Sequence, residues 1–233
     1  MNLTWKLDER LQAIAAMVPR GKTIADIGTD HAYLPVYLIK TGHIAAAIAS
    51  DLHEGPYRAA KKTVLAAGLE QSIDVRLGAG LEIIAPYEAE ILVMAGMGGS
   101  NMINILSEKR EVAASFERLI LQPMTYEAGV REYLTNNGWG IVDETLCLSD
   151  RKIYQIIAAE KNPASQIDPV FFEVGPKLWE ARHPLLKIML AEQIAHFKSV
   201  ARSMQKSAAP ETKLKRAALE KKIKELEEKF SCL

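Results

Sequence analysis

The sequence predicts an α/β fold with a mostly parallel sheet, followed by two C-terminal helices. Two observations support the sheet. Short apolar runs alternate with amphipathic helical segments, which is typical of parallel strands covered by helices on both faces. Near the end of this region, runs 140–148 and 152–159 are separated by only three residues. So short a link cannot make a parallel crossover, so we expect an antiparallel hairpin there.

The elements follow in order along the chain. An amphipathic helix comes first, because apolar residues from Leu7 to Val18 repeat with helical spacing, and the segment 19–22 ends it. Apolar runs then predict five strands, at 23–27, 44–50, 73–77, 90–95 and 118–122. Helical segments predict helices between them, at 35–41, 55–67, 99–107 and 126–137. A parallel sheet that ends in a hairpin outlines the Rossmann-like class I methyltransferase fold, whereas a dehydrogenase domain usually ends on a parallel strand.

The composition changes at Asn162-Pro163. Prolines mark a linker, and helices are expected at 185–205 and 211–230, separated by the loop 207–210. In the second helix the apolar residues Leu219, Ile223, Leu226 and Phe230 form a heptad seam. The loop is short, so the helices should pair as an antiparallel helical hairpin, a short coiled coil. The sequence therefore predicts two domains, residues 1–162 and 163–233.

The net charge of zero hides an asymmetry between these domains. Residues 1–162 carry 16 Lys and Arg against 20 Asp and Glu, and residues 163–233 carry 13 against 9. A basic tail can bind nucleic acid, although a solvated helical surface gives the same count. The two cysteines, Cys147 and Cys232, show no metal-ligand spacing, and the chain shows no signal-peptide or membrane-spanning pattern. We therefore expect a cytoplasmic protein without a bound metal.

The loop after the first strand carries the first candidate site. In an open α/β sheet this loop faces the ligand crevice, and Pro35 suits the first turn of the helix that follows. Gly28 lets the backbone approach a ligand closely, and the loop presents Asp30, His31 and Tyr33. A dinucleotide would need the G-x-G-x-x-G pattern, which fails here after its first glycine. The cationic S-adenosylmethionine suits a loop with carboxylates better.

Further candidates follow the other strands. Asp26 lies in the first strand and Asp51 ends the second, where a carboxylate can accept both ribose hydroxyls of a nucleoside cofactor; both could instead cap turns. Our assignment to the cofactor is Asp26, Gly28, Asp51, Leu52, Gly78, Gly80 and Gly96. Our assignment to the substrate is Arg10, Tyr33, Met97, Gln122 and Pro123. Met97 could be plain core, and the Gln122 amide could either read a base edge or cap the next helix.

Three motifs carry a resemblance to a known family. The stretches are Asp26–Pro35 (DIGTDHAYLP), Ala95–Gly99 (AGMGG) and Gln122-Pro123. With the C-terminal helical hairpin, they resemble the bacterial tRNA (adenine(22)-N(1))-methyltransferase family. The resemblance implies S-adenosylmethionine as methyl donor, tRNA as substrate and N1 of a D-loop adenine as acceptor. The alternatives are a nicotinamide-dependent oxidoreductase and a non-catalytic RNA-binding adaptor that keeps the cofactor-binding fold.

The chemistry of that reaction selects two catalytic candidates. N1 of neutral adenine has a free lone pair, so catalysis rests mainly on placing the ring in line with the methyl group. Asp30 or His31 could hold the exocyclic amine, and Asp30 ranks first because it is charged near neutral pH; His31 could instead be a packed loop residue. Tyr33 could stack on a flipped-out base. In the tail, the basic patch Lys213, Lys215, Arg216, Lys221, Lys222 and Lys224 is expected to contact RNA.

Overall fold

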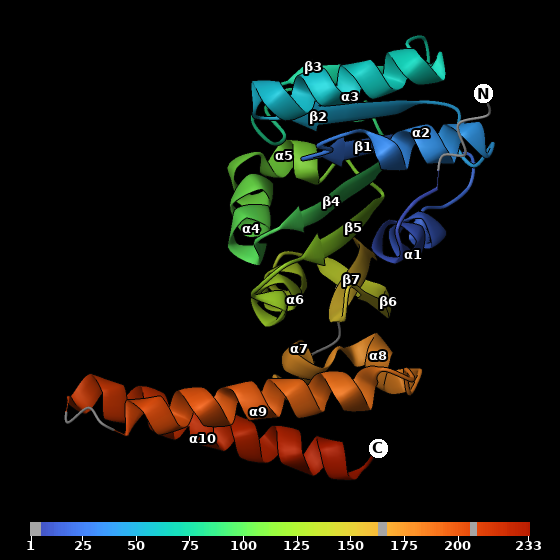
Figure 1. The fold of residues 1–233 in the computed structure, drawn as a ribbon. Helices are drawn as coiled ribbons and strands as arrows, with labels where there is room; N and C mark the ends of the chain where they lie inside the picture. Colours follow the sequence, from blue (N-terminus) through green and yellow to red (C-terminus); the bar gives the residue numbers. More distant parts are fainter. Residues whose placement is uncertain (1–5, 163–166, 206–208) are drawn as a thin grey trace. The chain divides into compact units, whose positions relative to one another are not determined.

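The computed structural model describes residues 6–162, 167–205 and 209–233. The chain divides into two compact units, Met1–Ser165 and Gln166–Leu233. Figure 1 shows the sheet with its helices in the first unit and a helical second unit. Pro163 of the expected linker and residues 207–208 of the expected helix–helix loop lie outside the described residues.

The first unit is built on a seven-stranded sheet with the order β3-β2-β1-β4-β5-β7-β6. Neighbouring strands from β1 to β5 pair in parallel, and β7 pairs antiparallel with both β5 and β6. Their bounds are β1 Ile24–Ile27, β2 Ala47–Asp51, β3 Ile73–Leu77, β4 Ile91–Met97, β5 Arg118–Pro123, β6 Trp139–Ser149 and β7 Lys152–Lys161. The predicted Rossmann-like methyltransferase sheet with its terminal hairpin is confirmed.

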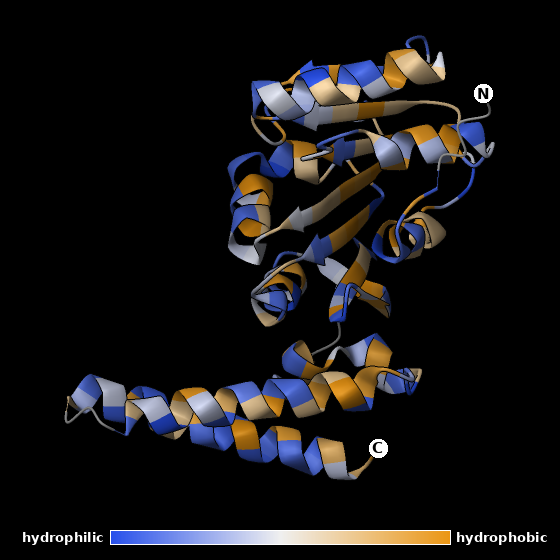
Figure 2. Cartoon of the chain, viewed as in Figure 1, coloured by the Kyte–Doolittle hydropathy of each residue, from blue (hydrophilic) through white to orange (hydrophobic). Residues whose placement is uncertain are grey.

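Helices bury the two faces of this sheet under separate apolar cores. The first core joins the sheet to α1 (Glu9–Met17), α2 (Tyr33–Lys40) and α3 (Glu54–Ala67). The second core joins it to α4 (Gly99–Glu108), α5 (Arg110–Ala113) and α6 (Glu127–Asn136). Strands β4 and β5 are mostly in the hydrophobic colours of Figure 2 because they are buried between these two layers. The central strands are thus packed on both faces, and their carboxyl ends can position side chains.

The second strand and the helix before it begin at other residues than the sequence predicts. The second strand begins at Ala47, not at residue 44, because the amides of His43 and Ile44 both donate to the Leu38 carbonyl and close the end of α2. Helix α2 begins at Tyr33, two residues early, after Ala32 at a φ of 55°. Pro35 still lies in the first turn of α2, where its missing N–H leaves no hydrogen bond unmade.

The second unit contains α7 (Val170–Val174), α8 (Pro176–Glu180), α9 (Leu186–Met204) and α10 (Pro210–Ser231). Helices α9 and α10 contact each other, and Ile223 and Leu226 of the predicted seam are buried. An ion pair between Lys198 and Glu227, 2.6 Å apart, also joins the two helices. The expected helical pair is confirmed, but the expected linker contains the short helices α7 and α8.

Candidate active site

The carboxyl ends of the parallel strands surround a cavity of about 440 Å³, which lies within the usual size range of small-molecule sites. We call it the first cavity. It is bordered by the ends of β1, β2 and β4, by the turn after β3 and by α4. Seven of the residues assigned from the sequence line it: Gly28, Asp51, Leu52, Gly78, Gly80, Gly96 and Met97. The structure thus brings together most of the cofactor assignment.

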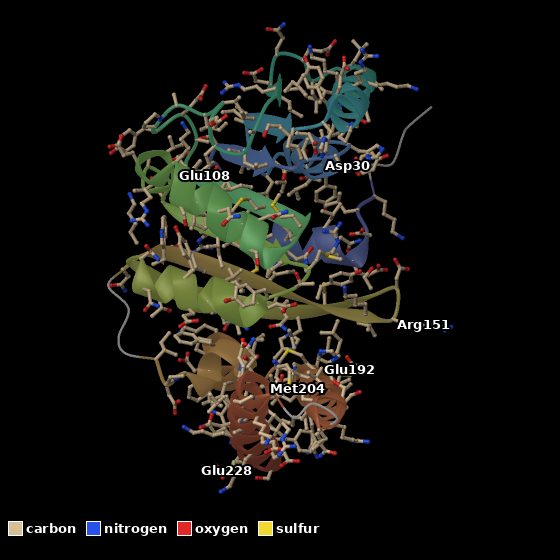
Figure 3. All side chains as sticks on the ribbon, turned by 90° about the vertical axis from the view of Figure 1, so that its left-hand side faces the viewer. Asp30, Glu108, Arg151, Glu192, Met204 and Glu228 are labelled. Atoms are coloured by element: carbon tan, nitrogen blue, oxygen red, sulfur yellow. The ribbon has the colours of Figure 1, made fainter. Side chains whose placement is uncertain are left out.

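A second cavity of about 450 Å³ adjoins the first. Gly28, Ala95 and Gly96 line both cavities, so the turns after β1 and β4 form the boundary between them. The second cavity gathers five more of the assigned residues, from α1, from β1 and from the loop and helix start that follow it: Arg10, Asp26, Asp30, His31 and Tyr33. Glu108 lines the first cavity and Asp30 lines the second. Figure 3 shows these two residues on opposite sides of the first unit.

The backbone of the loop after β1 lies in the left-handed region at three positions. Gly28 has a φ of 78°, Asp30 of 53° and Ala32 of 55°. The positive φ of Gly28 favours glycine, and a Cβ there would also lie 2.8 Å from Cε at the flexible end of the Met97 side chain, which would have to move. Aspartate tolerates this region better than most residues, but alanine does not. Strained backbone of this kind is typical of functional sites.

Asp26 is the buried acid of the second cavity, with 5% of its surface exposed. Its carboxylate accepts a hydrogen bond of 2.6 Å from Thr29 Oγ1. Burial raises the pKa of the Asp26 carboxyl from 3.8 to about 6, against the opposing effects of the Thr29 hydrogen bond and the Arg10 charge, while Asp51 raises it further. The site therefore contains an acid that titrates near neutrality and that a cationic ligand would favour in its charged form.

The catalytic candidates form a connected group on the surface of the second cavity. His31 Nδ1 lies 2.8 Å from Asp30 Oδ2. The rings of His31 and Tyr33 are stacked, with centroids 5.1 Å apart and planes 17° apart. Their side chains remain accessible, since Tyr33 is 46% exposed. The carboxylate can fix the imidazole, and the stacked rings offer a flat surface for an aromatic ligand.

Gln122 and Pro123 occupy a different position from the other assigned residues. Both are buried, and neither is among the described residues that line the two cavities. Gln122 Oε1 accepts hydrogen bonds from Arg10 Nη1 at 2.8 Å and from the Gly96 backbone at 3.1 Å. Gln122 therefore contacts two residues that line the second cavity, Arg10 and Gly96, without lining the cavity itself.

Two asparagines of α4 were missed in the sequence-based assignment. Asn101 and Asn104 both line the first cavity and are exposed. Residues three apart lie on the same face of a helix, and α4 begins at Gly99 directly after the end of β4. The three-residue spacing of Asn101 and Asn104, just after the fourth strand, could have indicated them from the sequence. Their amides add donors and acceptors to a wall that also contains apolar residues such as Leu81 and Ile105.

A further cavity of about 720 Å³ lies at the other end of the strands. It is lined by Thr23, Ala46 and Ser72, which precede β1, β2 and β3, and by residues of α3. Ligands of open α/β sheets bind at the carboxyl ends of the strands. We therefore assign the active site to the first and second cavities.

The described residues contain neither a cluster of metal ligands nor a membrane-spanning helix. In residues 6–162, 167–205 and 209–233, no three His, Cys, Asp or Glu side chains lie together as a metal site would require. Within the same residues, no helix is both long and apolar enough to cross a membrane.

The strand order, the terminal hairpin and the cavity at the carboxyl ends define a methyltransferase domain with a Rossmann-like sheet. In agreement, the family described as "Methyltransferase domain" matches residues 7–157. The tRNA (adenine(22)-N(1))-methyltransferase of Bacillus subtilis (strain 168) is 33% identical over 98% of this chain and 95% of its own. The chain therefore belongs to the tRNA (adenine(22)-N(1))-methyltransferase family.

Solved structures agree with this membership. A crystal structure of the B. subtilis m1A22 tRNA methyltransferase superposes with a TM-score of 0.87 at 32% identity, over 96% of this chain and 98% of that one. A Streptococcus pneumoniae protein solved in complex with S-adenosyl-L-methionine gives a TM-score of 0.80 at 32% identity, over 95% and 99% of the two chains. Both comparisons include the C-terminal helices as well as the sheet.

Proposed function

We propose that the protein transfers a methyl group from S-adenosylmethionine to N1 of adenine 22 in tRNA. One structural observation carries this proposal. The first cavity meets the second at Gly28, Ala95 and Gly96, so a cofactor and a base can approach each other across one short backbone boundary. The full-length similarity to the B. subtilis enzyme supports the choice of acceptor.

The residues of the first cavity fit the proposed cofactor. Asp51 lies in the wall, and one of its carboxylate oxygens accepts the His53 amide at 2.9 Å, which orients the group for the ribose hydroxyls. Leu52, Leu81 and Ile105 supply apolar surface for an adenine ring. Gly28 and Gly96 leave the backbone open where the cofactor would approach the second cavity, beside the carboxylate of Asp26. When bound, S-adenosylmethionine supplies a methyl group on an electrophilic sulfonium.

The chain's own residues then have to orient the acceptor. N1 of neutral adenine attacks with its lone pair, and the electrons of the broken carbon–sulfur bond leave on the sulfur, so the ring gains a positive charge. No proton has to be removed first, and rate depends mainly on alignment. Asp30 and His31 would hold the exocyclic amine and stabilise the charge that develops. A paired adenine hides N1, so the nucleotide would be unpaired or flipped out and stacked on Tyr33.

For the second unit we propose RNA binding by the exposed lysines of α10, with catalysis in residues 1–162. Salt bridges along α10 account for part of its charge pattern: Lys215–Glu211, Arg216–Glu220, Lys221–Glu225 and Lys224–Glu228 are all spaced i, i+4. Lys222 instead pairs with Glu173 of α7. The side chains of Lys215, Lys221 and Lys224 stay 66–80% exposed in these pairs, and such exposed pairs are weak enough for phosphates to compete. We place the enzyme in the cytoplasm, where its proposed substrate is found.

A methyl-transfer assay tests the proposed function directly. Unmodified tRNA is incubated with radiolabelled S-adenosylmethionine and the purified protein, and the labelled nucleoside is identified after digestion. We expect 1-methyladenosine, and we expect no label in a tRNA that carries guanine at position 22. Label in another nucleoside would refute the assigned acceptor. Calorimetry with S-adenosylmethionine and with NAD separates the methyltransferase from the oxidoreductase, and binding of tRNA without any transfer would indicate the adaptor.

A further inference from the structure

The end of β4 contains a β-bulge at the boundary of the two cavities. The register between β4 and β5 shifts between Ala95 and Met97, so Gly96 is the extra residue, and its φ of 78° is in the left-handed region. Gly96 N donates to the Gln122 side chain at 3.1 Å. A bulge leaves a backbone group without its ladder partner, and here the side chain of β5 provides one.

The same side-chain oxygen also holds Arg10. Arg10 Nη1 of α1 donates to Gln122 Oε1 at 2.8 Å, and Gln122 Nε2 donates to the Pro123 carbonyl at 2.9 Å. Gln122 is fully buried, so its amide cannot exchange these bonds for water at no cost. One amide group therefore ties together α1, the bulge of β4 and the end of β5.

We propose that Gln122 is a positioning residue for methyl transfer, which acts through Gly96 and Arg10 and does not touch the substrate. Gly96 lines both cavities and Arg10 lines the second, so Gln122 fixes two parts of the wall across which the methyl group passes. This inference rests on the proposed function. If Gln122 is removed, the two cavities persist but their alignment is disturbed, and alignment is the main source of rate in this reaction.

The first test compares Gln122→Met with Gln122→Glu. Methionine has a similar volume but only a weak sulfur acceptor. We therefore expect kcat to fall about 100-fold, the scale for a displacement of roughly 1 Å. The KM for S-adenosylmethionine should change little. Glutamate keeps an acceptor for Arg10 and Gly96, so we expect it to restore turnover at least about tenfold above the methionine variant. Equal activity of both variants with the wild type, or a loss confined to KM, overturns the proposal.

A matched control separates positioning from stability. Gln155 Oε1 on β7 accepts from Arg131 Nη2 at 2.7 Å, which is the same kind of hydrogen bond, and Gln155 is outside both cavities. We expect Gln155→Met to lower the melting temperature while kcat stays within about twofold of the wild type, because the bond it removes does not hold a cavity wall. A comparable fall of kcat in both variants would reduce Gln122 to a structural role.

Two further measurements complete the test. Hydrogen exchange of the Gly96 amide, read in the protein without ligands, should be faster in Gln122→Met than in the wild type; an unchanged rate refutes the bond to the bulge. In a double-mutant cycle, Arg10→Met combined with Gln122→Met should lose less than the product of the single losses, and full additivity overturns the coupling. If the wild-type protein itself fails to methylate tRNA, the proposed function fails, while the exchange experiment still tests Gln122.

Discussion

His31 Nδ1 and Asp30 Oδ2 lie 2.8 Å apart at the surface of the second cavity, in a loop whose backbone is left-handed on both sides of His31. The carboxylate thus fixes the orientation of the imidazole, and the two catalytic candidates act as one group. A substitution at position 30 changes three things together: the charge, the orientation of His31 and the strain of the backbone.

These effects can be separated with two variants of Asp30. Asparagine tolerates a positive φ, so we expect Asp30→Asn to keep its melting temperature and lose most turnover. Alanine does not, so Asp30→Ala should lose the same turnover and in addition about 1 kcal/mol of stability. Melting curves and single-turnover rates provide the measurements. Near-normal kcat in a folded Asp30→Asn protein would make Asp30 a spectator.

Asp51 should determine cofactor affinity. We expect Asp51→Ala to weaken S-adenosylmethionine binding by about 1–3 kcal/mol, the cost of leaving hydrogen bonds to a charged group unmade. Asp51→Asn keeps one acceptor oxygen and should lose less. Isothermal calorimetry measures both affinities. If the folded alanine variant binds the cofactor as tightly as the wild type, Asp51 does not contribute to cofactor binding.

Asp26 should make stability depend on pH. Its pKa is about 6 in the folded protein, above the ordinary 3.8, so the folded state binds the proton more tightly and stability falls as pH rises from 4 to 6. Above pH 6 the buried charge costs about 3 kcal/mol, which follows from the size of that shift. Asp26→Asn should therefore melt higher than the wild type at pH 8, and the difference should shrink at pH 5. A constant difference between pH 5 and pH 8 would argue against this titration.

Gly28→Ala should weaken cofactor binding beyond its effect on stability. The added Cβ would meet Met97 Cε at 2.8 Å, so we expect Met97 to move into the first cavity. Gly42→Ala is the matched control, because Gly42 has a φ of 65° and no atom within 4 Å of an added Cβ. Both variants should lose about 1 kcal/mol from backbone strain. Calorimetry should find weaker cofactor binding in Gly28→Ala alone; the same affinity in both would mean that Met97 moves elsewhere.

The tail prediction concerns salt dependence. Replacing Lys215, Lys221 and Lys224 with glutamine should weaken tRNA binding and flatten its salt dependence by about one log unit for each phosphate that is no longer neutralised. A variant with Lys40, Lys61 and Lys62 replaced, all in the first unit, changes the net charge equally and serves as control. Affinity is measured across a salt series for the three proteins. Identical slopes in both variants would mean that α10 does not bind RNA.

Local patterns predicted the strands, most helices and the cavity-lining loops because these follow from short-range physics. Apolar runs indicate buried strands. In the segment 28–35, Gly28 indicates a turn and Pro35 indicates the first turn of the next helix. The positioning role that we propose for Gln122 could not be predicted in this way. Its contacts with Arg10 and Gly96 span 112 and 26 residues and depend on a bulge, which only the pairing of β4 with β5 reveals. Helix α5, with four residues, is too short to show a periodicity.

The strand order also has a consequence for synthesis on the ribosome. The described residues that line the two cavities lie from Asp8 to Lys109, so they emerge early. Strands β5 and β6 emerge next, but β6 pairs only with β7, which lies between β5 and β6 in the sheet. A nascent chain that stops in the hairpin turn therefore presents β5 as an open edge, which invites pairing with other chains. The last strand to be translated, β7, is the one that covers β5 and joins β6 to the sheet.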